Sequence, residues 1–204
     1  MAVLNNVSSV LSHPALYLLY QSLVGGIGAR RKCVIEYVRP EPRLVVLDIG
    51  CGPGYTLRWF REPEYFGFDI SARYIRYAKE RHGTKGHFFC EPFEDAAIGW
   101  LPPADVVLLM GLVHHLDDHE AVQLFVRIKR AMKPAGRLFT LDGCYRQGQS
   151  IIARRLMDMD RGRFIRDEGS YRALAAQVFP TVRTFIREDF FRVPYTTIVM
   201  ECHP

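Results

Sequence analysis

An apolar run leads directly into a glycine-rich turn at residues 45–54, which have the sequence VVLDIGCGPG. A strand that is apolar on both faces is typical of a parallel sheet covered by helices. The glycines at positions 50, 52 and 54 can adopt positive φ and let the main chain approach a ligand closely. The run therefore predicts a strand that brings backbone to a ligand, followed by a helix that begins at Tyr55 and turns its first N–H groups toward an anion.

Strands and helices alternate along the rest of the chain. Further strands are expected at residues 65–69, 87–90, 104–110, 136–142, 182–187 and 195–202. The connection between the last two is too short for a parallel crossover, so that pair is expected to be antiparallel. Ser71 and either Asp117 or Asp118 are expected to cap helices that end near His82 and Pro134. The pattern predicts an α/β doubly wound, Rossmann-like domain: a mainly parallel seven-stranded sheet with a final antiparallel strand and helices on both faces.

We expect a single domain, because no linker or internal repeat divides the 204 residues. Four parts follow from the pattern: an N-terminal helical lid at residues 1–42, a ligand-binding core at 43–142, a substrate-side insertion at 143–180 and a closing antiparallel strand pair at 181–204. Apolar residues recur at helical spacing between residues 14 and 38, and Gly25 and Gly26 are the expected break in that helix.

Composition argues against several classes of protein. The five cysteines are scattered and none is paired as C-x-x-C, which disfavours a disulfide framework and a metal site and favours a reducing cytoplasm. No stretch has the eighteen or so apolar residues of a membrane helix, so we expect no membrane partner. The net charge is +5, but basic and acidic residues are interleaved, which favours a solvated surface over a nucleic-acid footprint.

The spacing of the glycines in this turn limits the class of ligand that it can bind. The glycines follow G-x-G-x-G, and Tyr55 stands where a dinucleotide fingerprint has its third glycine. No G-K-[ST] sequence follows, which excludes a phosphate-binding P-loop. Asp69 ends the second strand about twenty residues beyond the turn, where an acidic side chain can accept both hydroxyls of a ribose. These features predict an adenosine group without a pyrophosphate site.

Four stretches in order resemble the motifs of class I S-adenosylmethionine-dependent methyltransferases, most closely the small type 11 group. They are residues 48–54 (DIGCGPG), 67–71 (GFDIS), 111–116 (GLVHHL) and 138–142, which follow KPAG at 133–136. The resemblance covers roughly residues 40–142. It implies an enzyme with S-adenosyl-L-methionine as cofactor and S-adenosyl-L-homocysteine as product. It is specific to cofactor and fold and does not identify the methyl acceptor.

The resemblance also implies cofactor-binding residues. The glycines would pass under the methionine part beside Asp48, Asp69 would hold the ribose, and Ile70 would pack on adenine. Met110 and Gly111 would border the sulfonium. The family usually places an acidic residue in the loop after the third strand, and the local sequence CEPF at 90–93 departs from that pattern. The full set is Asp48, Gly50, Cys51, Gly52, Gly54, Tyr55, Asp69, Ile70, Glu91, Pro92, Met110 and Gly111.

Candidate catalytic residues are expected at the carboxyl ends of strands. Methyl transfer from a sulfonium is an in-line displacement, so the protein must align the acceptor and remove a proton where the acceptor carries one. His114, His115 and Asp142 occupy such positions, and Tyr20 could reach the cleft from the N-terminal helix. A histidine has a suitable pKa for a general base. The alternative is that the two histidines pack against and cap the following helix.

Candidate substrate-binding residues lie in the lid and the insertion. Three arginines fall between residues 160 and 166, and Arg161 and Arg166 are the best candidates to hold a carboxylate or phosphate of the acceptor. Alternatively, these arginines form ion pairs with neighbouring aspartates at a solvent-facing helix boundary. Tyr17, Tyr20 and Tyr195 complete the set, although the tyrosines could equally pack.

Three functions remain open. The leading hypothesis is a cytoplasmic methyltransferase that acts on a small molecule, in particular an acidic one. A nucleic-acid methyltransferase is the second, but we expect no recognition domain within these residues. The fourth strand also lacks a [DNS]-P-P-[YF] ending, and Cys144 lacks the preceding Pro or Thr expected of an RNA cytosine methyltransferase. The third is a non-catalytic S-adenosylmethionine-binding regulatory protein. The acceptor atom and the oligomeric state are not predicted.

Overall fold

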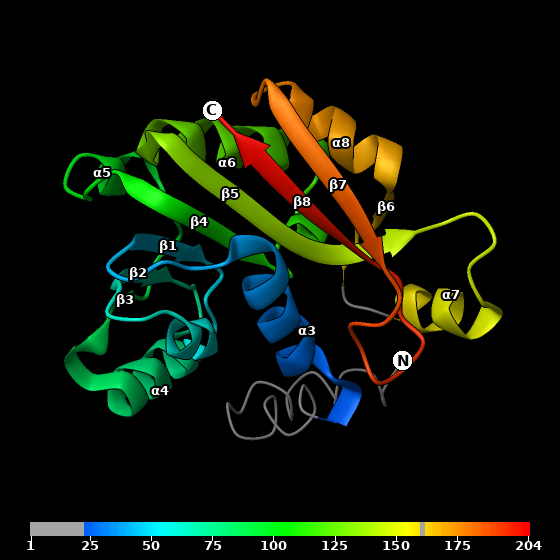
Figure 1. The fold of residues 1–204 in the computed structure, drawn as a ribbon, viewed down its shortest axis with the longest axis horizontal. Coiled ribbons are helices and arrows are strands. Elements are labelled where there is room, and N and C mark those ends of the chain that lie inside the picture. Colours follow the sequence, from blue (N-terminus) through cyan, green and yellow to red (C-terminus); the bar gives the residue numbers. More distant parts are fainter. Residues whose placement is uncertain (1–22, 160–161) are drawn as a thin grey trace.

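The computed structural model describes residues 23–159 and 162–204. Its centre is a sheet with the strand order β3-β2-β1-β4-β5-β8-β7 (Figure 1). The strands are β1 Val45–Ile49, β2 Glu64–Phe68, β3 His87–Phe89, β4 Ala104–Met110, β5 Met132–Tyr145, β7 Thr181–Arg187 and β8 Thr197–His203, and the two-residue β6 (Arg166–Asp167) pairs with the end of β5. The first five strands are parallel, and β8 is antiparallel to both of its neighbours. The predicted doubly wound sheet with an antiparallel last strand is confirmed.

Helices cover both faces of the sheet (Figure 1). One face packs against α3 (Gly26–Cys33) and α4 (Ala72–His82), and the other packs against α5 (Asp95–Ile98), α6 (Asp118–Ala131) and α8 (Glu168–Ala176). Successive residues of a strand point to opposite faces, so Val46 joins the first core and Leu47 the second. Both residues are buried, which explains why β1 is an unbroken apolar run.

Local sequence signals placed the starts of two helices correctly. The Ser71 side chain accepts a hydrogen bond from the Tyr74 N–H at the start of α4. Asp117, and not Asp118, caps α6: its carboxylate accepts from the Glu120 N–H at 2.8 Å, and Glu120 accepts from the Asp117 N–H at 2.9 Å. This reciprocal pair satisfies two N–H groups that have no partner within the helix.

Two local predictions were wrong. The segment after the glycine turn is a 3₁₀ helix, Tyr55–Trp59, and this short turn aligns few peptide dipoles, which removes the basis for an anion site at its start. Strand β5 begins at Met132 and runs through Pro134. The register there shifts, because Ala104 pairs with Met132 and Val106 pairs with Arg137. The proline therefore lies in a bulge, where its missing N–H costs no ladder bond.

The described part of the N-terminal region confirms the break predicted at Gly25, which has a φ of 92°. Helix α3 follows it and continues into a π-helix, Val34–Val38. Gly25 also allows a close approach, since a Cβ there would lie 2.6 Å from the Arg192 backbone nitrogen in the β7–β8 loop. Helix α3 is thereby positioned beside that loop. Residues 1–22 lie outside the described part, and so do the predictions for Tyr17 and Tyr20.

Candidate active site

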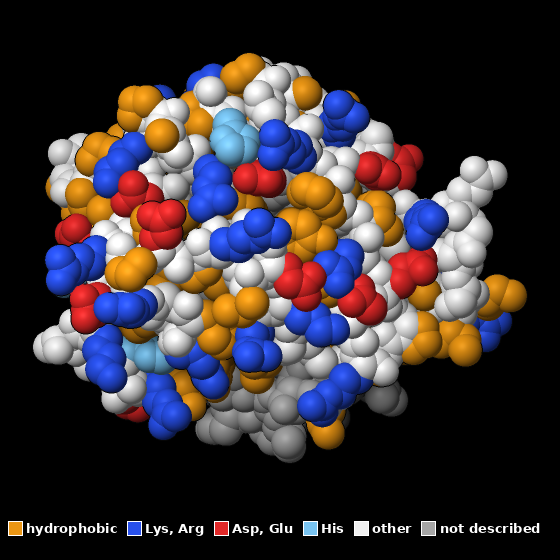
Figure 2. All heavy atoms as spheres, in the orientation of Figure 1, with side chains coloured by type: hydrophobic (Ala, Val, Ile, Leu, Met, Phe, Trp, Pro, Cys, Tyr) orange, Lys and Arg blue, Asp and Glu red, His pale blue; other side chains and the backbone are white. Residues whose placement is uncertain are grey.

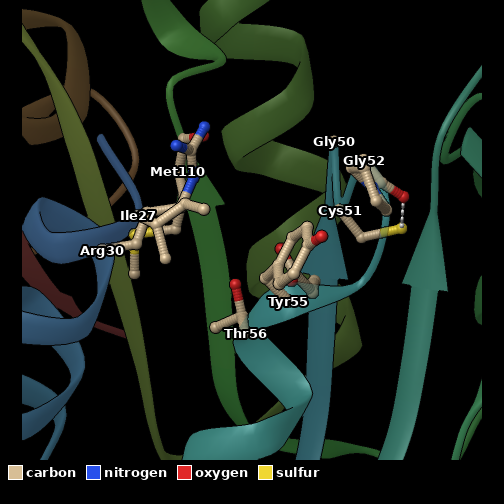
Figure 3. Close-up of a pocket in the computed structure, with 10 residues that line it drawn as sticks. Ile27, Arg30, Gly50, Cys51, Gly52, Tyr55, Thr56 and Met110 are labelled. Atoms are coloured by element: carbon tan, nitrogen blue, oxygen red, sulfur yellow. Dashed lines mark hydrogen bonds between the residues drawn. The ribbon is translucent and has the colours of Figure 1, made fainter. Parts of the chain in front are cut away.

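A cleft lies at the carboxyl ends of β1 and β4 and is bounded by α3. Figure 3 shows Arg30 and Met110 on one side of it and the glycine turn on the other. The residues that line the cleft are Ile27, Arg30, Asp48, Gly50, Cys51, Gly52, Pro53, Tyr55, Thr56 and Met110. Six of these, Asp48, Gly50, Cys51, Gly52, Tyr55 and Met110, were predicted from sequence as cofactor-binding residues, so the structure brings half of that set around one cleft.

The glycine turn is tied to the end of β2. Gly50 and Gly52 have φ values of 74° and 53°, as the sequence predicted. The N–H of Gly50 donates to the Phe68 carbonyl at 2.8 Å. One Asp69 oxygen accepts from the Gly52 N–H at 2.9 Å and the other from the Ser71 N–H at 2.8 Å. Burial raises the pKa of Asp69, and these two hydrogen bonds oppose the rise. Each oxygen keeps a second lone pair with which it can accept a ligand hydroxyl.

Asp48 is a buried carboxylate that lines the cleft. The Tyr65 hydroxyl donates to its Oδ2, whereas Oδ1 has no hydrogen-bond partner in the described part of the chain. Burial raises the pKa of Asp48 to about 6, although the Tyr65 hydrogen bond, the charge of Arg30 and the Thr56 side chain act in the opposite direction. A buried acceptor without a partner is costly, so the site suits a ligand with a cationic donor.

Arg30 is absent from the residues predicted from sequence. It projects from α3 into the cleft, and its Nη2 donates to the Met110 carbonyl at 3.1 Å. Residues 30–32 are all basic, and the basic residues of the chain as a whole were interpreted as solvated surface. The signal that could have found it is helical spacing: Ile27, Arg30 and Val34 are three and four residues apart and therefore share one face, which is apolar apart from the arginine.

The other predicted cofactor-binding residues lie around the cleft without lining it. Gly54 packs behind the turn, since a Cβ there would lie 2.8 Å from Cε1 of Phe88. Ile70 is 78% exposed, and the Cys90 thiol lies 3.9 Å from its carbonyl oxygen. Glu91 and Pro92 are exposed in the loop that follows β3. Gly111, with a φ of 81°, lies between Arg30 and His114.

The two adjacent histidines differ. Nδ1 of His114 lies 2.7 Å from Oδ1 of Asp142, which also accepts from the His114 backbone N–H at 3.2 Å. Both residues are buried, and Asp142 Oδ2 has no hydrogen-bond partner in the described ranges. His115 is exposed, with its ring centroid 4.2 Å from that of His114. Because Asp117 caps α6, neither histidine is needed as the cap that the alternative interpretation assigned to them.

The Arg166 guanidinium is engaged by groups of the protein itself. Its Nε and Nη2 donate to Asp118 at 2.9 and 2.7 Å, and its side chain is only 9% exposed. The structure therefore favours the ion-pair interpretation over the acceptor-binding one, because the guanidinium is already engaged. Tyr195 packs on Phe191, with ring centroids 4.9 Å apart. Arg161 lies outside the described residues.

Three further findings concern the described residues. Cys144 is buried, and burial raises the pKa of its thiol to about 12, which disfavours a nucleophilic thiolate. Among residues 23–159 and 162–204, no group of three or more His, Cys, Asp or Glu side chains could hold a metal ion. In the same ranges, no helix has the length and apolar character needed to cross a membrane.

Residues 46–136 match the family model described as "Methyltransferase domain". No curated protein matches the chain. Solved structures share its fold. The mitomycin 7-O-methyltransferase MmcR is 21% identical over 79% of this chain and 49% of its own, with a TM-score of 0.59. Magnesium protoporphyrin IX methyltransferase from Synechocystis PCC 6803, with bound SAH, is 19% identical over 91% of this chain and 87% of its own, with a TM-score of 0.64.

A phosphoethanolamine N-methyltransferase 2 from Haemonchus contortus, in complex with phosphomonomethylethanolamine and S-adenosylhomocysteine, is 16% identical over 85% of this chain and 52% of its own, with a TM-score of 0.66. The chain thus spans about half the length of this protein and of the mitomycin methyltransferase. The family match and the shared fold confirm the resemblance to class I methyltransferases, and the narrower likeness to the type 11 group stays a prediction.

Proposed function

We propose that this chain, which has the class I methyltransferase fold and a methyltransferase domain at residues 46–136, is an S-adenosyl-L-methionine-dependent methyltransferase that acts on a small molecule. The observation that carries the proposal is the charge pattern of the cleft. Asp48 and Arg30, of opposite charge, line it together beside the glycine turn. The expected cytoplasmic location belongs to the same proposal, and the described cysteines, all free, fit a reducing compartment.

An amino-acid group suits this pair. The methionine part of the cofactor carries an ammonium and a carboxylate, so it needs an anion and a cation at one site. Asp48 Oδ1 is an unpartnered acceptor for the ammonium, and the Arg30 guanidinium is a donor for the carboxylate. A pyrophosphate would be repelled by the buried Asp48 carboxylate. The cleft therefore favours S-adenosylmethionine over a dinucleotide.

The other predicted cofactor-binding residues flank the glycine turn and the end of β4. Asp69 stands beside Gly52 and would accept the ribose hydroxyls. Ile70 offers an exposed apolar surface for adenine, with Glu91 in the loop that begins next to it. Met110 and Gly111, at the end of β4, would border the sulfonium. Bound SAH in the Synechocystis structure, which shares the fold, supports this cofactor.

His114 is the proposed general base. The Asp142 carboxylate accepts at Nδ1, which leaves Nε2 without a proton and able to accept one from the acceptor. When bound, the cofactor supplies an electrophilic methyl group to an in-line nucleophile. The acceptor proton would pass to Nε2 as the acceptor attacks, and Asp142 would stabilise the imidazolium formed. Acceptors that carry a proton are therefore favoured.

Calorimetry with the full chain tests the cofactor. Saturable binding of S-adenosylmethionine and S-adenosylhomocysteine is expected, and Arg30→Met should weaken both through loss of the carboxylate contact. The control Arg172→Met removes an exposed arginine of α8 and should leave binding unchanged. Binding of NADH in preference to both ligands, or binding of neither, would overturn the proposal.

A nucleic-acid acceptor is the second candidate, and one observation favours it. The exposed face of α4 carries Arg73, Arg76, Lys79 and Arg81, and Figure 2 shows basic side chains gathered over this part of the molecule. Steeply salt-dependent RNA binding with methyl incorporation into RNA would promote it over a small molecule. Cofactor binding without methyl transfer to either class of acceptor would favour the third candidate, a regulatory protein.

A further inference from the structure

Arg166 is inserted into the turn that carries the two histidines, the 3₁₀ turn Val113–His115. Its Nη1 donates to the Val113 carbonyl at 3.3 Å and to the Phe164 carbonyl at 2.8 Å. Its Nη2 donates to the Leu116 carbonyl at 2.8 Å, and Asp118 neutralises its charge. One guanidinium thus joins both ends of the histidine turn to the insertion.

The same segment contacts His114 itself. The Phe164 N–H donates to the His114 carbonyl at 3.0 Å. Gly162 lies so close to the imidazole that a Cβ there would be 2.2 Å from Cδ2 of His114. A side chain at position 162 would therefore have to displace the ring.

These contacts act on the side of the imidazole that Asp142 does not hold. Asp142 fixes Nδ1, whereas the imidazole atoms nearest to a Cβ at Gly162 would be Cδ2 and Cγ. The Cε1 atom lies 3.7 Å from the point where a Cβ of Gly111 would be, and Gly111 also neighbours Arg30 of the cofactor cleft. The orientation of the ring decides whether Nε2 faces the acceptor.

We propose that Arg166, with Gly162, is a positioning residue for His114, and that it sets the orientation of the imidazole, whose tautomer Asp142 fixes, without touching substrate or cofactor. The inference rests on the proposed function, because it concerns the proposed base of that site. A guanidinium suits the task, since its planar fork reaches three carbonyls and a carboxylate at once, whereas a lysine ammonium is a single point charge. The two arginines then differ in role. Arg30 lines the cleft and would contact the cofactor, whereas Arg166 contacts only groups of the protein.

Nuclear magnetic resonance on the full, ¹⁵N-labelled chain tests the inference without any acceptor. When a histidine is held in one tautomer, its protonated and unprotonated ring nitrogens give two separate signals. When the ring exchanges between tautomers, the two signals merge toward an average position. We expect one tautomer for His114, identified by loss of its signals in His114→Gln. In Arg166→Met and Arg166→Lys the tautomer should persist, because Asp142 still holds Nδ1, but the ring signals of His114 should shift as the turn moves. The exposed Arg172→Met should leave these signals unchanged.

Two further measurements keep the outcomes separate. Gly162→Ala should shift the His114 ring signals even if the Arg166 variants fail to fold, while Gly148→Ala, at a glycine with open space around it, should not. Once an acceptor is identified, Arg166→Lys should lower kcat roughly tenfold or more and leave KM nearly unchanged.

A folded Arg166→Met or a Gly162→Ala with wild-type His114 signals would overturn the inference. Failure of the wild-type chain to bind S-adenosylhomocysteine would instead overturn the proposed function, because the His114 signals do not depend on it.

Discussion

The proposed cofactor side is a cleft whose lining residues come mostly from one stretch, residues 48–56, whereas the proposed acceptor side joins His114, Asp142 and Gly162 from three separate segments. On the cofactor side, short hydrogen bonds to Phe68 and Asp69 complete a turn whose shape is already set by its glycines. On the acceptor side, every position depends on contacts across the fold. A substitution far from the chemistry should therefore disturb the acceptor side more easily than the cofactor side.

The largest expected effect separates the two sides directly. His114→Gln should reduce the rate of methyl transfer by about 10² to 10⁴ by removing the general base, while S-adenosylhomocysteine affinity changes little. Single-turnover assays and calorimetry measure the two quantities. His115→Gln should cost much less, because His115 is exposed and Asp142 holds its neighbour instead. Equal losses in the two variants would contradict the division of roles.

A change on the cofactor side should act on stability instead. Gly54→Ala should lower the free energy of unfolding by about 2–3 kcal/mol, because the alanine would need a φ of 74° and its Cβ would lie 2.8 Å from the Phe88 ring. Urea denaturation measures it. Gly148→Ala is the matched control, since Gly148 has a φ of 77° and open space around it. The difference between the variants isolates the contact with Phe88, and equal costs would show that the contact is unimportant.

Asp48→Asn should weaken cofactor binding by about tenfold, because the ammonium loses its counter-charge. In the wild type, binding should also weaken as pH falls through about 6, where Asp48 takes up a proton. The variant should lack this pH dependence. Without ligand, the free energy of unfolding of the variant should not fall because the charge is missing. The pKa of Asp48 is raised in the folded state, so its ionisation destabilises the fold as the pH rises toward about 6. Calorimetry across pH is the measurement, and an unchanged pH profile in the variant would contradict the assignment.

The smallest effect concerns the insertion. Tyr145→Phe removes a hydrogen bond of 2.7 Å from the Tyr145 hydroxyl to Asp158, which links the end of β5 to α7 (Ile151–Asp158). The hydrogen bond is exposed, so the free energy of unfolding should fall by only about 0.5 kcal/mol. Amide exchange in α7 should nevertheless accelerate, and a larger global loss would show that the acceptor side is more tightly coupled to the core than its contacts indicate.

Much of the fold followed from neighbouring residues. The β1 run, the positive φ of its glycines and the caps at Ser71 and Asp117 are determined within a few positions, where steric limits and local hydrogen bonds decide conformation. The strand at residues 132–136 was missed because a bulge depends on the partner strand. The helix expected after the glycine turn was shorter and tighter than its local pattern predicted.

By itself, the sequence determined the doubly wound fold and the glycine turn, and it predicted six of the ten residues that line the proposed cofactor cleft, because these depend on spacing within short stretches. Only the tertiary structure placed Arg30 in that cleft, distinguished His114 from His115, and turned Arg166 from an expected acceptor ligand into a contact of the histidine turn. The physical reason is that a long arginine side chain hydrogen-bonds to groups distant in sequence, which only the folded chain brings near. The Met110 carbonyl lies 80 residues from Arg30, and the Leu116 carbonyl lies 50 residues from Arg166.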